Sequence, residues 1–132
     1  MKNQEFEQRI EKYLKRQFGI TIAAASKRQV YEALMSTVRE KLSEKKFAYE
    51  QELKKTKQKR AYYMSMEFLV GRTLRNNLFN LGIEKETKEY LEKNNFNLDD
   101  IYDIEPDPGL GNGGLGRLAS CYLDALTSSC LL

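Results

Sequence analysis

The chain has 132 residues, 31% of them charged, a net charge of +3 and a mean hydropathy of −0.64. This length allows one domain at most. Because no apolar run approaches the roughly 18 residues of a membrane span, the sequence predicts a soluble rather than a membrane protein. The first eight residues hold no apolar core, so we expect no signal peptide. Histidine is absent, which excludes histidine-based chemistry within this chain.

The distribution of charge bears on the kind of partner, and the cysteines bear on the cellular compartment. Residues 1–60 hold 16 Lys and Arg against 8 Asp and Glu, whereas residues 61–132 hold 6 against 11. A basic half indicates either nucleic-acid binding or a solvated helix surface. Cys121 and Cys130 are nine positions apart, which points them to different faces of one helix. We therefore expect reduced thiols in a cytoplasmic protein and no disulfide.

The first half of the chain predicts two helices. Residues 4–18 carry apolar side chains at steps of three and four, and Gly19 ends this amphipathic helix. Residues 20–25 form a short apolar connection. Ser26 and Gln29 then make a capping box that begins the second helix. No glycine or proline interrupts residues 26–60, so one long helix and two helices with a joint at residues 43–46 both remain open.

A basic run and an aromatic run follow. Five of the seven residues 54–60 are Lys or Arg, which fits a polyanion contact or a helix end that leads into a strand. We favour the helix end, because aromatic residues for base stacking are missing. Residues 61–66 are uncharged and aromatic, and they predict a buried strand, the first of an α/β sheet. Glu67 then lies at the end of the strand where such sheets bind ligands, although it also fits a surface carboxylate or a partner of Arg72.

Short helices are predicted between residues 73 and 105. Residues 73–81 form one that Gly82 ends, and residues 83–93 form another with Glu84, Lys88 and Glu92 as exposed neighbours. Asn97 caps a third over residues 98–105, with Leu98, Ile101, Tyr102 and Ile104 facing inward. Asp99, Asp100 and Asp103 lack the glycine and the terminal glutamate of a calcium loop, so we expect no metal site.

The most unusual stretch is Asp107–Arg117, where five of eight consecutive positions from Gly109 are glycine. A helical pattern follows at once, with Leu115, Leu118, Tyr122 and Leu126 on one stripe. A glycine loop that opens a helix presents unpaired amides and a positive dipole end, which favours an anion, most often phosphate. The alternative is a turn needed only for chain reversal and tight packing. A G-x-G-x-x-G pattern is present, but the acids and prolines before it do not predict the strand that a dinucleotide site needs.

Two segments together resemble the α-glucan phosphorylases, the family of glycogen, starch and maltodextrin phosphorylases. Within residues 59–77 the chain reads Tyr-Tyr-Met-Ser-Met-Glu-Phe and, two residues later, Gly-Arg. The glycine stretch, followed by Arg-Leu-Ala and then Tyr-Leu-Asp, is the second family pattern. Weaker similarity extends back to about Val30, so the resemblance covers roughly residues 30–125.

The resemblance implies the amino-terminal part of a two-domain Rossmann-like (GT-B type) glycosyltransferase fold, which is an α/β class that is mostly helical in this piece. It implies a pyridoxal phosphate-dependent glucan phosphorylase, in which inorganic phosphate cleaves terminal α-1,4 glucosyl units to glucose 1-phosphate. Family members are several times longer and carry the cofactor on a lysine toward their carboxyl end. That lysine has no counterpart here, so we expect this chain alone to be inactive.

The resemblance also implies site residues. The backbone amides of Gly113, Gly114 and Leu115 would face the phosphates and the glucosyl unit, and Asn112 would lie beside the cofactor. Arg117 would either reinforce the positive field or brace the loop with a salt bridge. Glu67 belongs to the family's core motif near the active site, without an assigned role in proton transfer.

For the whole protein, we expect residues 1–58 to be a helical region with homodimer contacts and residues 59–132 to begin the α/β domain. The implied partners are an α-1,4-glucan and phosphate, with neither nucleic acid nor a membrane. The alternative is a non-catalytic interaction fragment that pairs through residues 26–53. Because the match fades after Ala125, we expect a fragment or a truncated reading frame. The sequence leaves open which glucan is used, whether an effector acts and whether the piece folds alone.

Overall fold

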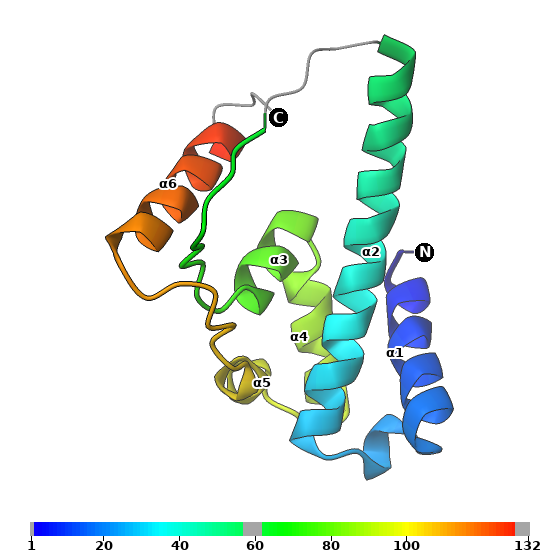
Figure 1. Ribbon diagram of the computed structural model, residues 1–132. Coiled ribbons are helices and arrows are strands. Elements are labelled where there is room, and N and C mark those ends of the chain that lie inside the picture. The colour runs from blue at the N-terminus through cyan, green and yellow to red at the C-terminus, as the bar shows by residue number, and fades with distance from the viewer. Residues whose placement is uncertain (1, 57–61, 129–132) are drawn as a thin grey trace. The chain divides into compact units, whose positions relative to one another are not determined.

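The computed structural model describes residues 2–56 and 62–128, and every regular element within these ranges is a helix (Figure 1). Their bounds are α1 (Lys2–Phe18), the 3₁₀ helix η1 (Ile22–Ala24), α2 (Lys27–Thr56), α3 (Leu74–Leu81), α4 (Glu84–Lys93), α5 (Leu98–Ile104) and α6 (Gly114–Ser128). Within these ranges, none of the helices combines the length and the apolar character that crossing a membrane requires.

The chain divides into two compact units, each made of two segments. The helical unit comprises Met1–Gln58 and Leu74–Glu105, and the glycine-loop unit comprises Lys59–Thr73 and Pro106–Leu132. Residues 74–105 thus pack with the amino-terminal helices. The predicted domains, residues 1–58 and 59–132, concern the longer protein and stay a prediction.

The core of the helical unit lies along α2, with α1 beside it and α3, α4 and α5 packed together (Figure 1). Ile10 and Leu14 of α1 are fully buried, as are Val30 and Leu34 of α2. The shorter helices contribute the buried side chains Leu74, Leu78, Leu91, Leu98 and Ile101. The periodic apolar positions that predict these helices therefore form one continuous core.

Local signals set the helix ends as predicted. The Ser26 amide donates to Gln29 Oε1 (2.8 Å), and the Gln29 amide donates to Ser26 Oγ (3.3 Å), which is the reciprocal capping box. Asn97 Oδ1 accepts from the Asp99 amide (2.9 Å) at the start of α5. Gly19 and Gly82, just after α1 and α3, have φ values of 70° and 67° that favour glycine.

The question of one long helix or two is settled by α2, which runs unbroken from Lys27 to Thr56. Lys54 and Lys55 lie in its last turn, where cations favour the helix dipole. The rest of the predicted basic run, residues 57–60, lies outside the described residues.

Arg9 ties α1 to α2 through two carboxylates of α2, and it also contacts one on its own helix. Its guanidinium contacts Glu5 (2.7 Å) on α1 and both Glu44 (2.8 Å) and Glu40 (3.5 Å) on α2. The Arg9 side chain is 23% exposed, so these bonds to a planar fork hold the two helices in register more firmly than a single surface pair would.

The prediction that Glu84 is an exposed i,i+4 partner of Lys88 is wrong, because Glu84 contacts residues of two other helices. Glu84 Oε1 instead accepts the Tyr102 hydroxyl (3.1 Å) and lies 3.8 Å from Arg75 Nε. The Arg75 guanidinium also lies over the Tyr102 ring, 5.8 Å from its centroid. Three helices that are separate in sequence meet here, a contact that spacing within one helix cannot reveal.

The predicted buried strand over residues 61–66 is wrong. Ala61 lies outside the described residues, and residues 62–66 are in no strand. Tyr62, Met64 and Met66 are 80%, 89% and 94% exposed. A strand needs a neighbour to pair with, and the described ranges hold no second strand.

The carboxylate of Glu105 joins the two ends of the segment formed by residues 74–105. Both oxygens of the buried Glu105 accept from the Leu74 amide, at 3.2 and 3.0 Å, so a residue just after α5 caps the start of α3. Glu105→Ala would leave that amide unpaired in a buried place, and we expect a loss of about 1–2 kcal/mol in the free energy of unfolding. Urea unfolding followed by circular dichroism measures it, with Glu89→Ala on the surface of α4 as the control. A Glu105→Ala value equal to that of the control would contradict this role.

The stability of the helical unit should fall in alkali because of Tyr90. Burial, the charge of Glu11 and the 3.2 Å hydrogen bond to Glu11 Oε1 raise the pKa of the Tyr90 hydroxyl above its ordinary value. Above pH about 10 the unfolded chain loses this proton while the folded chain keeps it, so stability is fully present below that pH and declines above it. Urea midpoints should fall less steeply with pH in Tyr90→Phe, and Tyr62→Phe, at an exposed position, should follow the unaltered chain. Parallel curves for all three proteins would refute the assignment.

Candidate functional site

The glycine loop begins with a tight turn. Asp107 Oδ1 accepts from the Gly109 amide (2.9 Å), and Gly109 has a φ of 63°, a left-handed conformation that side chains other than glycine rarely adopt. This turn leads the chain out of Pro108 and toward the start of α6. Gly109 is therefore explained by chain reversal alone.

Two further glycines allow the backbone of residues 67–69 to lie against the loop. A Cβ at Gly111 would lie 3.0 Å from the Leu69 nitrogen and 3.1 Å from the Phe68 carbonyl carbon. A Cβ at Gly116 would lie 3.1 Å from both Glu67 Cβ and the Leu69 nitrogen. A Cβ at either position would be tighter than most real contacts and would push the backbone of residues 67–69 away by a few tenths of an ångström, so Gly111 and Gly116 serve close packing.

Backbone hydrogen bonds fix that approach. The Phe68 amide donates to the Leu110 carbonyl (2.8 Å), and the Leu69 amide donates to the Gly116 carbonyl (3.0 Å). Ser120 Oγ, one turn further along α6, donates to the same Gly116 carbonyl (3.1 Å). The two family motifs of the sequence thus form one structural element, although about 40 residues separate them.

The remaining two glycines have no such explanation. A Cβ at Gly114 would meet nothing within 4 Å, and one at Gly113 would meet only Glu67 Oε2 at an ordinary 3.8 Å. Neither residue has a positive φ. Contacts within the described chain therefore give no reason for glycine at position 114, which leaves room for a group from outside to approach the backbone.

The first turn of α6 presents free amides at this place. Gly113 accepts from the Arg117 amide through its carbonyl (3.1 Å) and so stands at the helix start. Among the residues that the structure describes, the amides of Gly113, Gly114 and Leu115 donate to no acceptor, and all three residues are exposed. Such amides, at the positive end of a helix dipole, suit an anion or an oxygen that develops negative charge.

Glu67 lies under this turn. Its Oε2 would be 3.3 Å from a Cβ at Gly116, and it is buried without a hydrogen-bond partner among the described residues. Ser65 Oγ holds the backbone beside it, because it donates to the Glu67 carbonyl (2.8 Å) and accepts from the Glu67 amide (3.3 Å). The unpaired oxygen leaves an acceptor for a donor from outside.

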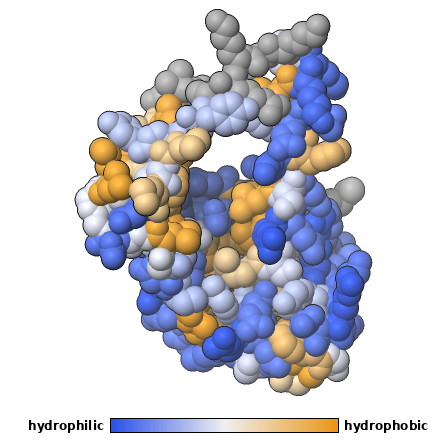
Figure 2. All heavy atoms as spheres, in the orientation of Figure 1, coloured by the Kyte–Doolittle hydropathy of each residue, from blue (hydrophilic) through white to orange (hydrophobic). Residues whose placement is uncertain are grey.

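The buried face of α6 is its small-residue face. Gly116, Ala119 and Ser120 are buried, whereas the apolar stripe of the sequence is turned outward, with Leu115 at 52%, Leu118 at 47% and Tyr122 at 48% exposed. Figure 2 shows a hydrophobic patch over α6, in contrast to the hydrophilic outer surface of α1. Large apolar residues usually mark a buried side, but on α6 the buried side carries the small residues.

Tyr63 is the aromatic link within the glycine-loop unit. Its ring lies 5.8 Å from that of Tyr122 and 6.4 Å from that of Phe68, both edge to face. Exposure then alternates along the segment, since Tyr63 packs on α6 while its neighbours Tyr62 and Met64 face outward. This alternation is typical of a strand with one covered face.

The structure brings the six predicted site residues to one place. Gly113, Gly114 and Leu115 form the first turn of α6 with Glu67 beneath it, and Asn112 precedes the turn and is exposed. Arg117 is also exposed in that turn, and within the described ranges it forms no ion pair, so the predicted bracing salt bridge is not seen there. Sequence reasoning gave tight packing as the alternative for the whole loop, and the structure shows it at Gly111 and Gly116, which spacing alone does not single out.

Known proteins of one family are similar to this chain. The family model described as carbohydrate phosphorylase matches residues 91–131. The glycogen phosphorylase of Chlamydia pneumoniae is 45% identical over 105 residues, which is 80% of this chain and 13% of that protein. The brain form of glycogen phosphorylase of Bos taurus is 42% identical over 104 residues, covering 79% and 12%. The maltodextrin phosphorylase of Streptococcus pneumoniae is 37% identical over 119 residues, covering 90% and 15%. The chain therefore spans 12–15% of the length of these relatives.

The two classes of glycine should respond oppositely to alanine. Gly116→Ala forces a Cβ against Glu67 and the Leu69 backbone, and we expect it to destabilise the chain by about 1–3 kcal/mol. Gly114→Ala meets open space and removes backbone freedom from the unfolded chain, so it should be neutral or stabilise by up to about 1 kcal/mol. Urea unfolding of both variants measures the difference. Equal destabilisation by the two substitutions would mean that Gly114 also serves packing.

Proposed function

This chain belongs to the carbohydrate phosphorylase family, and we propose that it is an amino-terminal part of an α-1,4-glucan phosphorylase that releases glucose 1-phosphate from terminal glucosyl units. The proposed reaction class rests on the names of the relatives, glycogen phosphorylase and maltodextrin phosphorylase. One structural observation carries the site: exposed, unbonded amides at the start of α6, where position 114 has no steric need for glycine.

The residues present fit one end of a pyridoxal phosphate and phosphate site. Two neighbouring dianions need donors and positive potential, and the free amides of Gly114 and Leu115 at a helix start offer both. When bound, the cofactor would supply an acidic phosphate beside the substrate phosphate. In this proposal the amides of Gly113, Gly114 and Leu115 orient the phosphates and the glucosyl unit, Asn112 lies on the cofactor side, and Arg117 adds positive charge.

Glu67 has a positioning role in this proposal. A carboxylate close to bound phosphates repels them, so its unpaired oxygen directs a hydroxyl or a cationic group, rather than a phosphate, to its own side of the turn. The sugar would thereby be distinguished from the phosphates within one small site. Removal of the charge in Glu67→Gln keeps the shape but turns one acceptor into a donor.

We propose that the fold of the whole protein is the two-domain GT-B arrangement. The exposure of Tyr62, Met64 and Met66 supports this, since the rest of the polypeptide would cover these apolar side chains. For the whole protein we also propose a cytoplasmic homodimer with contacts along α2. Phe47 and Tyr49, which are 65% and 49% exposed, support such contacts.

The simplest test uses the chain as it stands. With pyridoxal phosphate, inorganic phosphate and glycogen or maltodextrin present, the 132-residue chain should release no glucose 1-phosphate, while a complete relative assayed beside it should release the product. Turnover by the chain alone would overturn the proposal that the cofactor lysine lies elsewhere.

The site itself is tested in a longer protein. Once the downstream coding DNA has been read, this protein is made with the family sequence that continues past Leu132. Gly114→Ala should lower kcat/KM for phosphate by roughly 10²-fold, because its methyl group keeps the ligand from the amides. Cys121→Ala, an exposed change on the same helix, is the matched control. Unchanged kinetics in Gly114→Ala would remove the loop from the phosphate site.

A further inference from the structure

The peptide bond before α6 joins Asn112 to Gly113, and no other asparagine in the sequence is followed by glycine. Both residues are exposed. The Gly113 carbonyl accepts from the Arg117 amide (3.1 Å), but within the described ranges the Gly113 amide donates to no acceptor. Because Gly113 has no Cβ, its backbone nitrogen is also open to approach from the side chain of the preceding residue.

The Asn112 side chain makes no hydrogen bond within the part of the chain that the structure describes. Asparagines elsewhere are held by such bonds. Asn94 Nδ2 donates to the Tyr90 carbonyl (2.8 Å), and Asn97 Oδ1 accepts from the Asp99 amide (2.9 Å). A carboxamide without a partner is free to change its side-chain rotamer, so its carbonyl carbon can turn toward the next backbone nitrogen.

The amide that follows an asparagine is a second point of difference. The Phe96 amide, directly after the exposed Asn95, donates to the Leu91 carbonyl (2.9 Å). An amide that already donates has to lose that hydrogen bond before its nitrogen can react. The Gly113 amide has no such bond to lose among the described residues.

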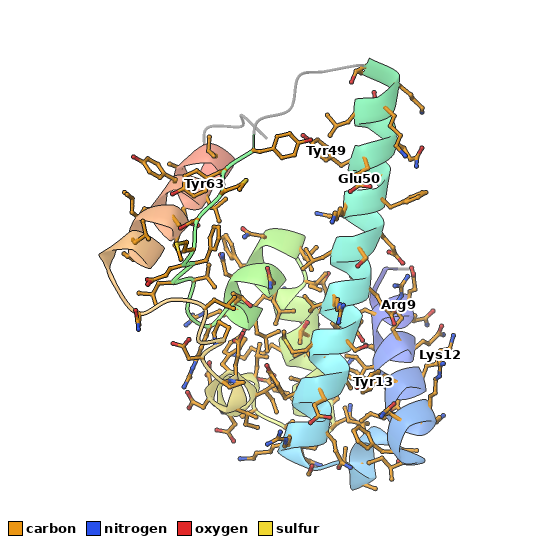
Figure 3. All side chains as sticks on the ribbon, viewed as in Figure 1. Arg9, Lys12, Tyr13, Tyr49, Glu50 and Tyr63 are labelled. Atoms are coloured by element: carbon orange, nitrogen blue, oxygen red, sulfur yellow. The ribbon has the colours of Figure 1, made fainter. Side chains whose placement is uncertain are left out.

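The loop around the Asn-Gly bond is anchored on both sides. The Leu110 carbonyl accepts a backbone hydrogen bond before it (2.8 Å), and the Gly116 carbonyl accepts another after it (3.0 Å). Further along α6, the rings of Tyr63 and Tyr122 lie 5.8 Å apart, and Figure 3 shows Tyr63 beside this helix. The reactive atoms thus lie between anchored points.

We propose that Asn112 is a modification site at which the chain deamidates without an enzyme. The Gly113 nitrogen loses its proton to hydroxide and forms a bond to Asn112 Cγ, and the bond from Cγ to the side-chain nitrogen breaks. That nitrogen takes a proton from water, which restores the hydroxide, and leaves as ammonia. Water then opens the remaining cyclic imide at either carbonyl group, which yields aspartate or isoaspartate. The positive end of α6 favours the deprotonated Gly113 nitrogen.

The products change the charge at the start of α6. Aspartate or isoaspartate adds a negative charge directly before Gly113, where the dipole and the free amides of the first turn favour an anion. This charge would compete with the phosphates of the proposed function. The deamidation itself does not depend on that function, because it needs only water and this chain.

The test follows the 132-residue chain in phosphate-free buffer at neutral and at mildly alkaline pH, both folded and in urea that unfolds it. Mass spectra of its proteolytic peptides measure the replacement of NH₂ by OH at each asparagine. The variant Gly113→Ala places a Cβ beside the reacting nitrogen, and this Cβ would meet only Glu67 Oε2, at an ordinary 3.8 Å. Cys121→Ala, an exposed change on the same helix, is the control.

We expect Asn112 to react faster than Asn95 and the rate to rise with pH. The folded chain should react at no less than about a tenth of the rate of the unfolded chain, since a larger slowing would mean that the fold withholds the nitrogen by more than one hydrogen bond. Gly113→Ala should slow the reaction at least about tenfold, because its Cβ crowds the nitrogen, and Cys121→Ala should leave it unchanged.

A folded chain that reacts far more slowly than this would overturn the proposal, because the structure would then hold the Gly113 nitrogen away from Asn112 Cγ. Equal rates at Asn112 and Asn95, or an equal rate in Gly113→Ala and the unaltered chain, would also overturn it.

Discussion

The contact on which the candidate site depends is steric: the backbone of residues 67–69 runs where side chains at Gly111 and Gly116 would otherwise stand. Two backbone hydrogen bonds, from Phe68 to Leu110 and from Leu69 to Gly116, become available only at this separation. They place Glu67 under the first turn of α6 and leave Gly113 and Gly114 on the open side. The loop is therefore both a packing device and a set of free donors, with different glycines serving each purpose.

Much of the helical unit is predictable from the sequence because its signals are local. The reciprocal hydrogen bonds of Ser26 and Gln29 involve residues three apart, and Asn97 caps a residue two positions away. The apolar periodicity of α1 and α2 predicts the faces on which these two helices pack against each other. Local chemistry and tertiary packing agree in these elements, which is why the predicted bounds hold to within a few residues.

The errors arise where the deciding partner is distant or lies outside the chain. The aromatic pattern of residues 62–66 predicts a strand, but strand formation requires a neighbouring strand that the described residues do not contain. The stripe of apolar residues predicted on α6 is turned outward, and its periodicity alone does not tell which neighbour would cover it. Glu84 joins Arg75 and Tyr102 from two other helices, a contact that no spacing rule could show.

The hydrogen bonds between Leu74 and Glu105 have a consequence for the order of folding. They join residues 31 positions apart, so the helical unit, once formed, already holds together the two ends from which the glycine-loop segments continue. Bringing Phe68 to Leu110 then requires closing only the short flanks rather than the whole intervening loop, and the entropic cost of closure grows with loop length. The folded helices thus lower the entropic cost of closing the glycine loop, and by linkage the closed loop stabilises the helices by the same free energy.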